Sequence, residues 1–298
     1  KFGNFMLKEK ILNKEKNLLL YALTPPKAEF KEAKLREIAD RWTARIESVN
    51  ADGLVLYEVQ DESDRSDAQR TFEFSGTLSP QSYYANYLKV ATPSVFYRVA
   101  GGYDESEFRA ALAAQSADLC VLVGATSSAQ KTRLDLTRAY EIAGEFKNLA
   151  SGGICIAERH GKKGDEPQRM QEKIRLGAKF FISQAIFDAD LARKFLEDCA
   201  AAEISEPIFL TFSTAGNPKT LEFIKWLGVS VPQSVENRLN ASEDYLAQSC
   251  EIIKEIWSEL KSFGDKNGLN LSANIESVMA KRAEIEASLE LAREFRLL

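Results

Sequence analysis

The sequence contains few of the residues that mark several common classes of site and protein. Its 298 residues include one histidine and four widely separated cysteines, with no CxxC spacing. Neither a metal site nor a disulfide framework is therefore expected, and the cysteines are expected to be buried and reduced. No apolar run approaches the roughly 20 residues that a membrane helix needs. No secretory cleavage site follows the first apolar segment, so a cytoplasmic protein is expected.

The charge balance also narrows the class of partner. The net charge is −5, which implies no strongly basic face and argues against a nucleic-acid partner. Hydrophobic residues make up 45% of the chain, enough to form one large core. The length and the lack of any linker predict a single domain over residues 1–298.

Short apolar runs alternate with segments of helical periodicity along the whole chain. Eight runs predict strands: Asn17–Leu23, Gly53–Val59, Ser94–Val99, Asp118–Gly124, Gly152–Glu158, Lys179–Gln184, Pro207–Phe212 and Leu269–Ala273. The segments between and after them predict helices: Glu29–Ser48, Pro80–Leu88, Glu105–Ala114, Leu134–Phe146, Glu166–Leu176, Ala189–Ala202, Lys219–Trp226, Ser242–Phe263 and Ile275–Phe295.

The form of the strands and their order predict the fold class. The apolar runs are continuous, as in parallel strands buried on both faces. A strand followed by helix eight times predicts an α/β fold, a single (β/α)₈ TIM barrel with extra helices near the C-terminus. A doubly wound sheet is the alternative, but no GxGxxG follows the first strand.

In such a barrel the site lies where the strands end, and three polar groups fall there. Gln184 ends the apolar stretch GAKFFISQAIFD, where its amide either pairs within the core or points at a ligand. His160 falls in a polar, glycine-rich segment with several basic residues, either a ligand loop or a solvated one. The acidic loop after the second strand offers Asp61 and Glu62 as a general acid or base, or is simply solvated.

The middle of the chain carries a family resemblance. The stretch AERHGKKGDEPQRMQEKIRLGAKFFISQAIFDADLARKF, from Ala157 to Phe195, resembles the fifth- and sixth-strand region of the methylenetetrahydrofolate reductase family. That family has a YPE-x-H-type loop there, a helix ending in K-x-x-x-GA and a strand ending in TQ-x-x-FD. The start LLLYALTPPKA and the later PIFLTFSTAGNPK are similar to the family's first and seventh strands.

The resemblance implies a flavoenzyme of one-carbon metabolism and methionine biosynthesis. Family members are (β/α)₈ barrels that bind FAD and reduce a methylene-folate with NAD(P)H as electron donor. By this resemblance His160 contacts the flavin, and Glu166 and Lys173 lie near its phosphate and ribose. Gln184 contacts the pterin ring of the substrate.

The sequence also departs from the family pattern at the positions that carry the chemistry. Ala22 stands where the family has the glutamate that activates the substrate, and Ala125 stands where it has an aspartate near the flavin. Phe96 and Ala157 replace a histidine and a tyrosine, and Glu276 falls where the family has an arginine. General acid help is worth roughly 10²–10⁴ in rate, so a catalytic acid has to come from elsewhere. Candidates are Glu58, Asp61, Glu62 and Glu158.

Three functions therefore stay open at the level of sequence. The first is a flavin-dependent oxidoreductase that acts on a reduced folate or pterin. The second is a flavin-free, folate-binding methyl or one-carbon transferase, and the third is a non-catalytic descendant that binds a metabolite or a protein. The long C-terminal helices leave open whether the chain forms a homo-oligomer.

Overall fold

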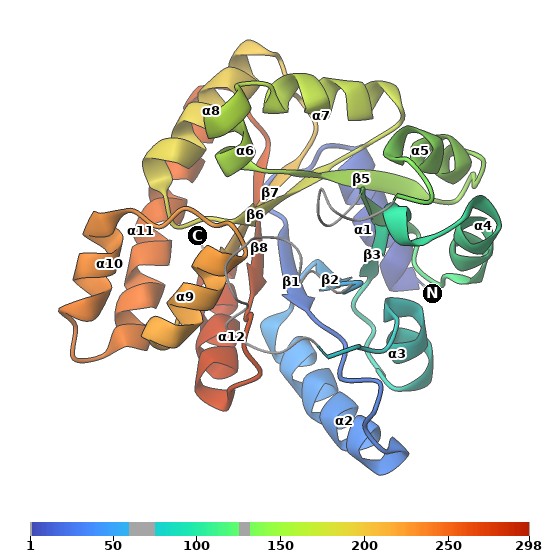
Figure 1. Ribbon diagram of the computed structural model, residues 1–298, viewed down its shortest axis with the longest axis horizontal. Coiled ribbons are helices and arrows are strands. Elements are labelled where there is room, and N and C mark those ends of the chain that lie inside the picture. Colours follow the sequence, from blue (N-terminus) through green and yellow to red (C-terminus); the bar gives the residue numbers. More distant parts are fainter. Residues whose placement is uncertain (1, 60–74, 125–131, 298) are drawn as a thin grey trace.

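Eight parallel strands form a closed barrel with helices around it. The computed structural model describes residues 2–59, 75–124 and 132–297. Each strand pairs with the next in chain order, and β8 pairs with β1 to close the barrel. Figure 1 shows the helices on the outside of the strands. The predicted (β/α)₈ barrel is confirmed.

The strands lie close to their predicted positions. They are β1 Leu19–Leu23, β2 Gly53–Leu56, β3 Ser94–Val99, β4 Leu119–Val123, β5 Ala150–Cys155, β6 Phe181–Ala185, β7 Ile208–Ser213 and β8 Leu271–Glu276. Strands β2 and β5 end three residues before their predicted ends, Val59 and Glu158, whereas β8, predicted to end at Ala273, runs on to Glu276. This extension brings three more residues into the barrel wall.

The helices follow the strands, with four departures from the prediction. Those in the described residues are α1 Phe2–Leu12, α2 Glu32–Val49, α3 Pro80–Asn86, α4 Glu105–Ala114, α5 Leu136–Gly144, α6 Ala157–Lys163, α7 Glu166–Arg175, α8 Ala189–Ala201, α9 Pro218–Trp226, α10 Gln233–Asn240, α11 Tyr245–Lys266 and α12 Arg282–Leu297. Helices α1 and α10 were not predicted, and α6 forms where a loop was expected. Helix α12 begins at Arg282 rather than Ile275, because the residues before it belong to β8 and the turn after it.

Short polar side chains fix where many of the helices begin. In each case a side-chain oxygen accepts a hydrogen bond from a backbone N–H of the first turn, which has no partner inside the helix. The capping residues are Ser79, Asp104, Asp135, Asp188, Asn217 and Asp244. These residues place the first turns of α3, α4, α5, α8, α9 and α11.

Alternation along the strands separates two hydrophobic cores. Side chains facing outward from the strands pack against the helices, and inward-facing ones fill the barrel, including Leu20, Val55, Val121 and Phe209. The glycine at position 152 makes room for the ring of Phe180, because a Cβ there would lie 2.6 Å from that ring. The interior of the barrel is thus packed with side chains, so a ligand site has to lie at one end of the barrel.

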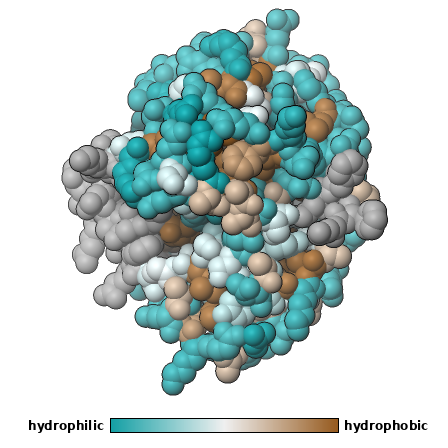
Figure 2. Space-filling model, turned by 90° about the vertical axis from the view of Figure 1, so that its right-hand side faces the viewer, coloured by the Kyte–Doolittle hydropathy of each residue, from teal (hydrophilic) through white to brown (hydrophobic). Residues whose placement is uncertain are grey.

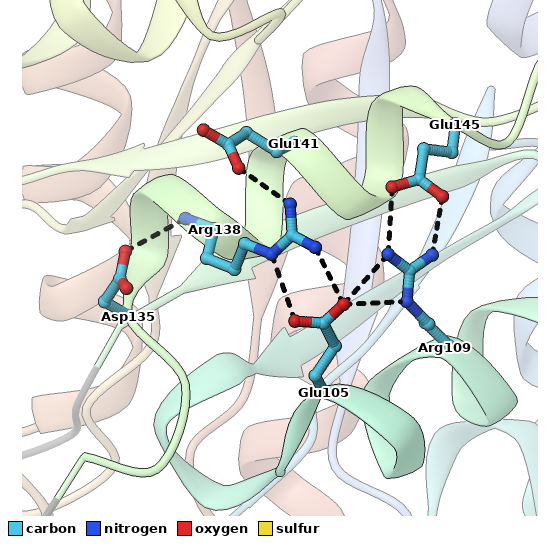
Figure 3. Close-up of polar contacts among 6 residues, drawn as sticks. All are labelled: Glu105, Arg109, Asp135, Arg138, Glu141 and Glu145. Carbon is cyan, nitrogen blue, oxygen red and sulfur yellow. Dashed lines mark hydrogen bonds and ion pairs between the residues drawn. The ribbon is translucent and has the colours of Figure 1, made fainter.

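An exposed ion-pair network joins the helices that follow β3 and β4 (Figure 3). Glu105 on α4 accepts hydrogen bonds from its neighbour Arg109 and from Arg138 on α5, at 3.0 and 2.7 Å. Arg109 also pairs with Glu145 at the end of α5. The two arginines, Arg138 first, lower the pKa of Glu105 to about 2. Because the network is exposed to solvent, it positions the helices more than it stabilises the fold.

The outer surface is mostly polar. The face drawn in Figure 2 is largely hydrophilic, with hydrophobic residues in small scattered groups. The large hydrophobic side chains that the described residues expose are Met6, Leu12 and Leu297. In the part of the chain that the structure describes, no helix combines the length and apolar character needed to cross a membrane.

Candidate functional site

The accessible end of the barrel interior is where the strands end. Six inward-facing residues at this end keep solvent-accessible surface, whereas the inward-facing residues below them are buried. They are Tyr57, Tyr97, Val123, Ile154, Gln184 and Glu276. We call these six residues the mouth floor. Two rings, two aliphatic groups, an amide and a carboxyl make a surface suited to a flat ligand with polar edges.

A hydrogen-bonded chain crosses the mouth floor from β7 to β2. Asn274 Nδ2 donates to Thr211 Oγ1 at 3.0 Å and to the hydroxyl of Tyr57 at 3.3 Å. That hydroxyl in turn donates to Glu276 Oε2 at 2.6 Å. The Tyr57 and Tyr97 rings meet edge to face, with centroids 4.7 Å apart. Burial, and to a smaller extent the charge of Glu276, raises the pKa of both phenols well above its usual range, so both stay neutral.

Glu276 is the carboxyl group of the mouth floor. Its strand position pairs with Ala22 of β1 on one side and Ser213 of β7 on the other. Burial raises its pKa to about 7, and the hydrogen bond from Tyr57 offsets only part of that rise. No cation among the described residues forms an ion pair with Glu276. A carboxyl group in this setting changes charge near neutral pH.

Gln184 faces the interior beside an irregularity in the sheet. The pairing of β6 with β7 shifts register between Ile182 and Ala185. There Ser183 Oγ accepts from the backbone N–H of Thr211 at 2.9 Å, in place of a ladder bond. Gln184 Nε2 reaches Leu227 O only at 3.4 Å. Its predicted place at the end of a strand, facing the mouth, is confirmed, and this long hydrogen bond leaves its amide available to a ligand.

The side chains assigned to FAD by resemblance lie in the wall outside the barrel. Glu166 is fully buried, with both oxygens bound by Arg159 at 2.5 Å and one also by the N–H of Ile156 at 3.1 Å. Lys173 packs across Gly153 and donates to Ile154 O at 2.6 Å. Burial lowers its pKa to about 8. These contacts tie α6 and α7 to β5.

His160 is also held by contacts within the protein. It was expected in an open loop, and this is wrong: it lies in α6 and is 5% exposed. Its Nε2 bonds Asp198 of α8 at 2.8 Å, and its ring meets Phe195 edge to face. The helix exposes Lys162 and Lys163 to solvent, while His160 and Gly161 pack against Phe195 and Leu191 of α8. Its contact with a flavin stays a prediction.

The remaining acid candidates lie outside the mouth floor or outside the described residues. Asp61 and Glu62 fall in the range 60–74, which the structure does not describe. Ala125 falls in a second such range, 125–131. Glu58 turns toward the loop after β3, where it accepts from Val99 N–H at 2.6 Å and from the hydroxyl of Tyr103. Glu158 accepts from Ser230 N–H at 2.9 Å, and burial raises its pKa. In the ranges described, no three metal-binding side chains gather into a candidate ion site.

Tyr57, Tyr97 and Glu276 were not among the site residues predicted from the sequence. Tyr57 and Tyr97 could have been found from strand alternation, because each lies two residues beyond an inward-facing valine, Val55 and Val95. Glu276 was hidden, because the residues around it were predicted to begin a helix. Its only signal was that it falls where the related family has an arginine.

The fold is a (β/α)₈ barrel whose candidate site lies at the ends of its strands, and comparisons identify its family. A model of the family described as methylenetetrahydrofolate reductase matches residues 158–283. A solved structure from Clostridium thermocellum, of an uncharacterized protein that binds two copies of 5-methyl-5,6,7,8-tetrahydrofolic acid, is 38% identical. The alignment covers 98% of this chain and 99% of that one, with a TM-score of 0.85. The chain belongs to the methylenetetrahydrofolate reductase family.

More distant structures share the fold alone. Tryptophan synthase from M. tuberculosis is 11% identical, with a TM-score of 0.50 over 98% of this chain and 97% of that one. A 2,3-dimethylmalate lyase is 10% identical, with the same TM-score over 98% and 85%. A search among curated proteins gives no match.

Proposed function

We propose that this protein binds a reduced folate of the 5-methyltetrahydrofolate class at its mouth floor. The observation that carries the proposal is the composition of that surface. A reduced pterin is a compact ring with hydrogen-bond donors and acceptors on its edges. Tyr57, Tyr97 and Ile154 offer contact to the ring, and Gln184 and Glu276 offer polar partners to its edges. The folate bound by the 38% identical relative supports the same ligand class here.

FAD does not fit the side chains that the resemblance assigns to it. Glu166 already accepts from Arg159 and a backbone N–H, and Lys173 already donates to Ile154 O. His160 Nε2 is bound to Asp198, and its Nδ1 is buried without a partner among the described residues. A flavin would have to break these contacts or find other residues. We therefore propose a folate site that works without FAD.

A flavin-dependent reductase with NAD(P)H as donor is the second candidate, and membership of the family favours it. The two candidates separate in one measurement. The absorbance spectrum is recorded for the purified protein, and again after incubation with FAD and gel filtration. A retained flavin spectrum that NADH or NADPH bleaches would establish the reductase and overturn the flavin-free site. A protein that stays colourless supports the site proposed here.

Folate binding itself is tested by calorimetry with 5-methyltetrahydrofolate. Gln184→Ala should weaken binding about tenfold, because it removes roughly one net hydrogen bond to the ligand. Gln171→Ala is the matched control, since that amide also donates to a single backbone carbonyl, Ala202 O, but lies on α7. The control should bind as the unmodified protein does. Equal affinity for both variants would remove Gln184 from the site.

A further inference from the structure

Glu276 stands among neutral groups in the part of the chain that the structure describes. In register beside it stand Ala22 and Ser213, which carry no charge. The titratable groups that face it are the phenols of Tyr57 from β2 and Tyr97 from β3, both neutral. Tyr21 of β1 packs on the outer side of the barrel, where its hydroxyl is hydrogen-bonded to Ser288, so it can influence Glu276 only across the strand. Among the described residues, only the hydrogen bond from Tyr57 favours the carboxylate form of Glu276.

The direction of the hydrogen bonds leaves one carboxyl oxygen free. Asn274 Nδ2 can only donate, so the Tyr57 hydroxyl accepts from it and gives its own proton to Glu276 Oε2. Oε2 is therefore an acceptor, and a proton on the carboxyl belongs on Oε1. No hydrogen bond within the described residues reaches Oε1. The side chain keeps accessible surface at the mouth, where a ligand can meet it.

We propose that Glu276 is the proton donor of the folate site, and the proposal rests on the folate function above. On binding, the O–H bond of the carboxyl breaks and an N–H bond forms at a basic ring nitrogen of the reduced pterin. The complex then holds a carboxylate beside a ring ammonium, with no net gain or loss of protons. Protonation of that nitrogen would make it a better leaving group for a carbon attached to it.

The pKa of the group is consistent with this role. Burial raises the pKa of Glu276 to about 7, so the free protein carries the proton in weakly acidic solution and loses it as the pH rises through 7. The contrary arrangement is an ionised Glu276 that accepts from ring N–H groups of the pterin. The two arrangements predict opposite exchanges of protons with the buffer.

Calorimetry in buffers of different ionisation enthalpy counts the protons exchanged when 5-methyltetrahydrofolate binds. A donor at Glu276 predicts almost no exchange at pH 6 and uptake approaching one proton at pH 8. The dissociation constant should rise up to about tenfold per pH unit above 7. Release of a proton at pH 6 would overturn the proposal, because the ligand would then require the carboxylate. Absence of binding at every pH would instead remove the folate site, and the donor with it.

Three variants make the assignment specific to this residue. Glu276→Gln should abolish the uptake at pH 8 and flatten the pH dependence; unchanged uptake would overturn the proposal. Glu158→Gln is the matched control, a carboxyl of raised pKa away from the floor, and should leave uptake unchanged. Tyr57→Phe keeps the carboxyl and removes the hydrogen bond that lowers its pKa. It should move the pH midpoint upward, and an unmoved midpoint would count against Glu276.

Discussion

Two glutamates of this barrel have opposite electrostatic surroundings. Glu166, in the wall behind β5, is fully buried and receives two hydrogen bonds from Arg159 and one from a backbone N–H. Within the described residues, Glu276 at the mouth floor has a single neutral donor, Tyr57, and no cation. The first arrangement satisfies a charge and holds α6 and α7 in place. The second leaves a carboxyl group whose charge depends on pH and on what binds.

Under the function proposed above, the residues that resemble other family members and the residues that meet the ligand lie in different parts of the chain. The residues that most resemble the related family, from Ala157 to Phe195, contain Glu166 and Lys173, which serve the wall. The mouth floor carries Glu276 at a position where the family has another residue type. A motif kept for its packing is therefore a weak guide to the reaction.

The largest effect is expected from breaking the pair in the wall. Arg159→Ala leaves Glu166 buried at 0% exposure without its cation. Removing one partner of a buried ion pair typically lowers the free energy of unfolding by about 3–5 kcal/mol. Denaturant unfolding followed by circular dichroism measures the loss.

The control for this variant is an arginine on α7, about one helical turn after Glu166. Arg169→Ala removes an exposed pair with Asp165, both side chains at least 40% exposed. That change should cost well under about 1 kcal/mol. If Arg159→Ala cost no more than its control, Glu166 would not depend on Arg159, and the contrast with Glu276 would fail.

The next largest effect is an increase in the free energy of unfolding, and it depends on pH. Glu276→Gln should stabilise the free protein at pH 8 by up to about 3 kcal/mol, since the pKa rises from 4.5 unfolded to about 7 folded. Between those values the native state holds more protons than the unfolded chain, so ionisation of Glu276 costs stability as pH rises. The gain should shrink to nothing near pH 4.5. Unfolding curves at pH 5, 6, 7 and 8 give the profile, and a gain that is independent of pH would contradict it.

The sequence predicts the barrel well because its strands are apolar runs buried on both faces. It predicts the place of Gln184 for the same reason, since that residue ends such a run. It could not predict Glu276, because β8 presents Ser272, Asn274 and Glu276 to the interior and so lacks the apolar run by which a strand is recognised. Helix α6 was missed in the converse way, since its polar sequence AERHGKK was taken for a loop and its packing against α8 and α7 is not visible in the sequence.

The smallest effect comes from the neutral donor at the mouth floor. Tyr57→Phe removes one hydrogen bond to Glu276, with an expected loss of about 1 kcal/mol at pH 8 in the free energy of unfolding. At pH 5 the loss should be smaller, because the protonated carboxyl is the weaker acceptor of the Tyr57 proton. In the Glu276→Gln background the same change should lose this dependence on pH. A loss as large as that of Arg159→Ala would mean that Tyr57 holds a full charge at Glu276, and the two glutamates would then be alike.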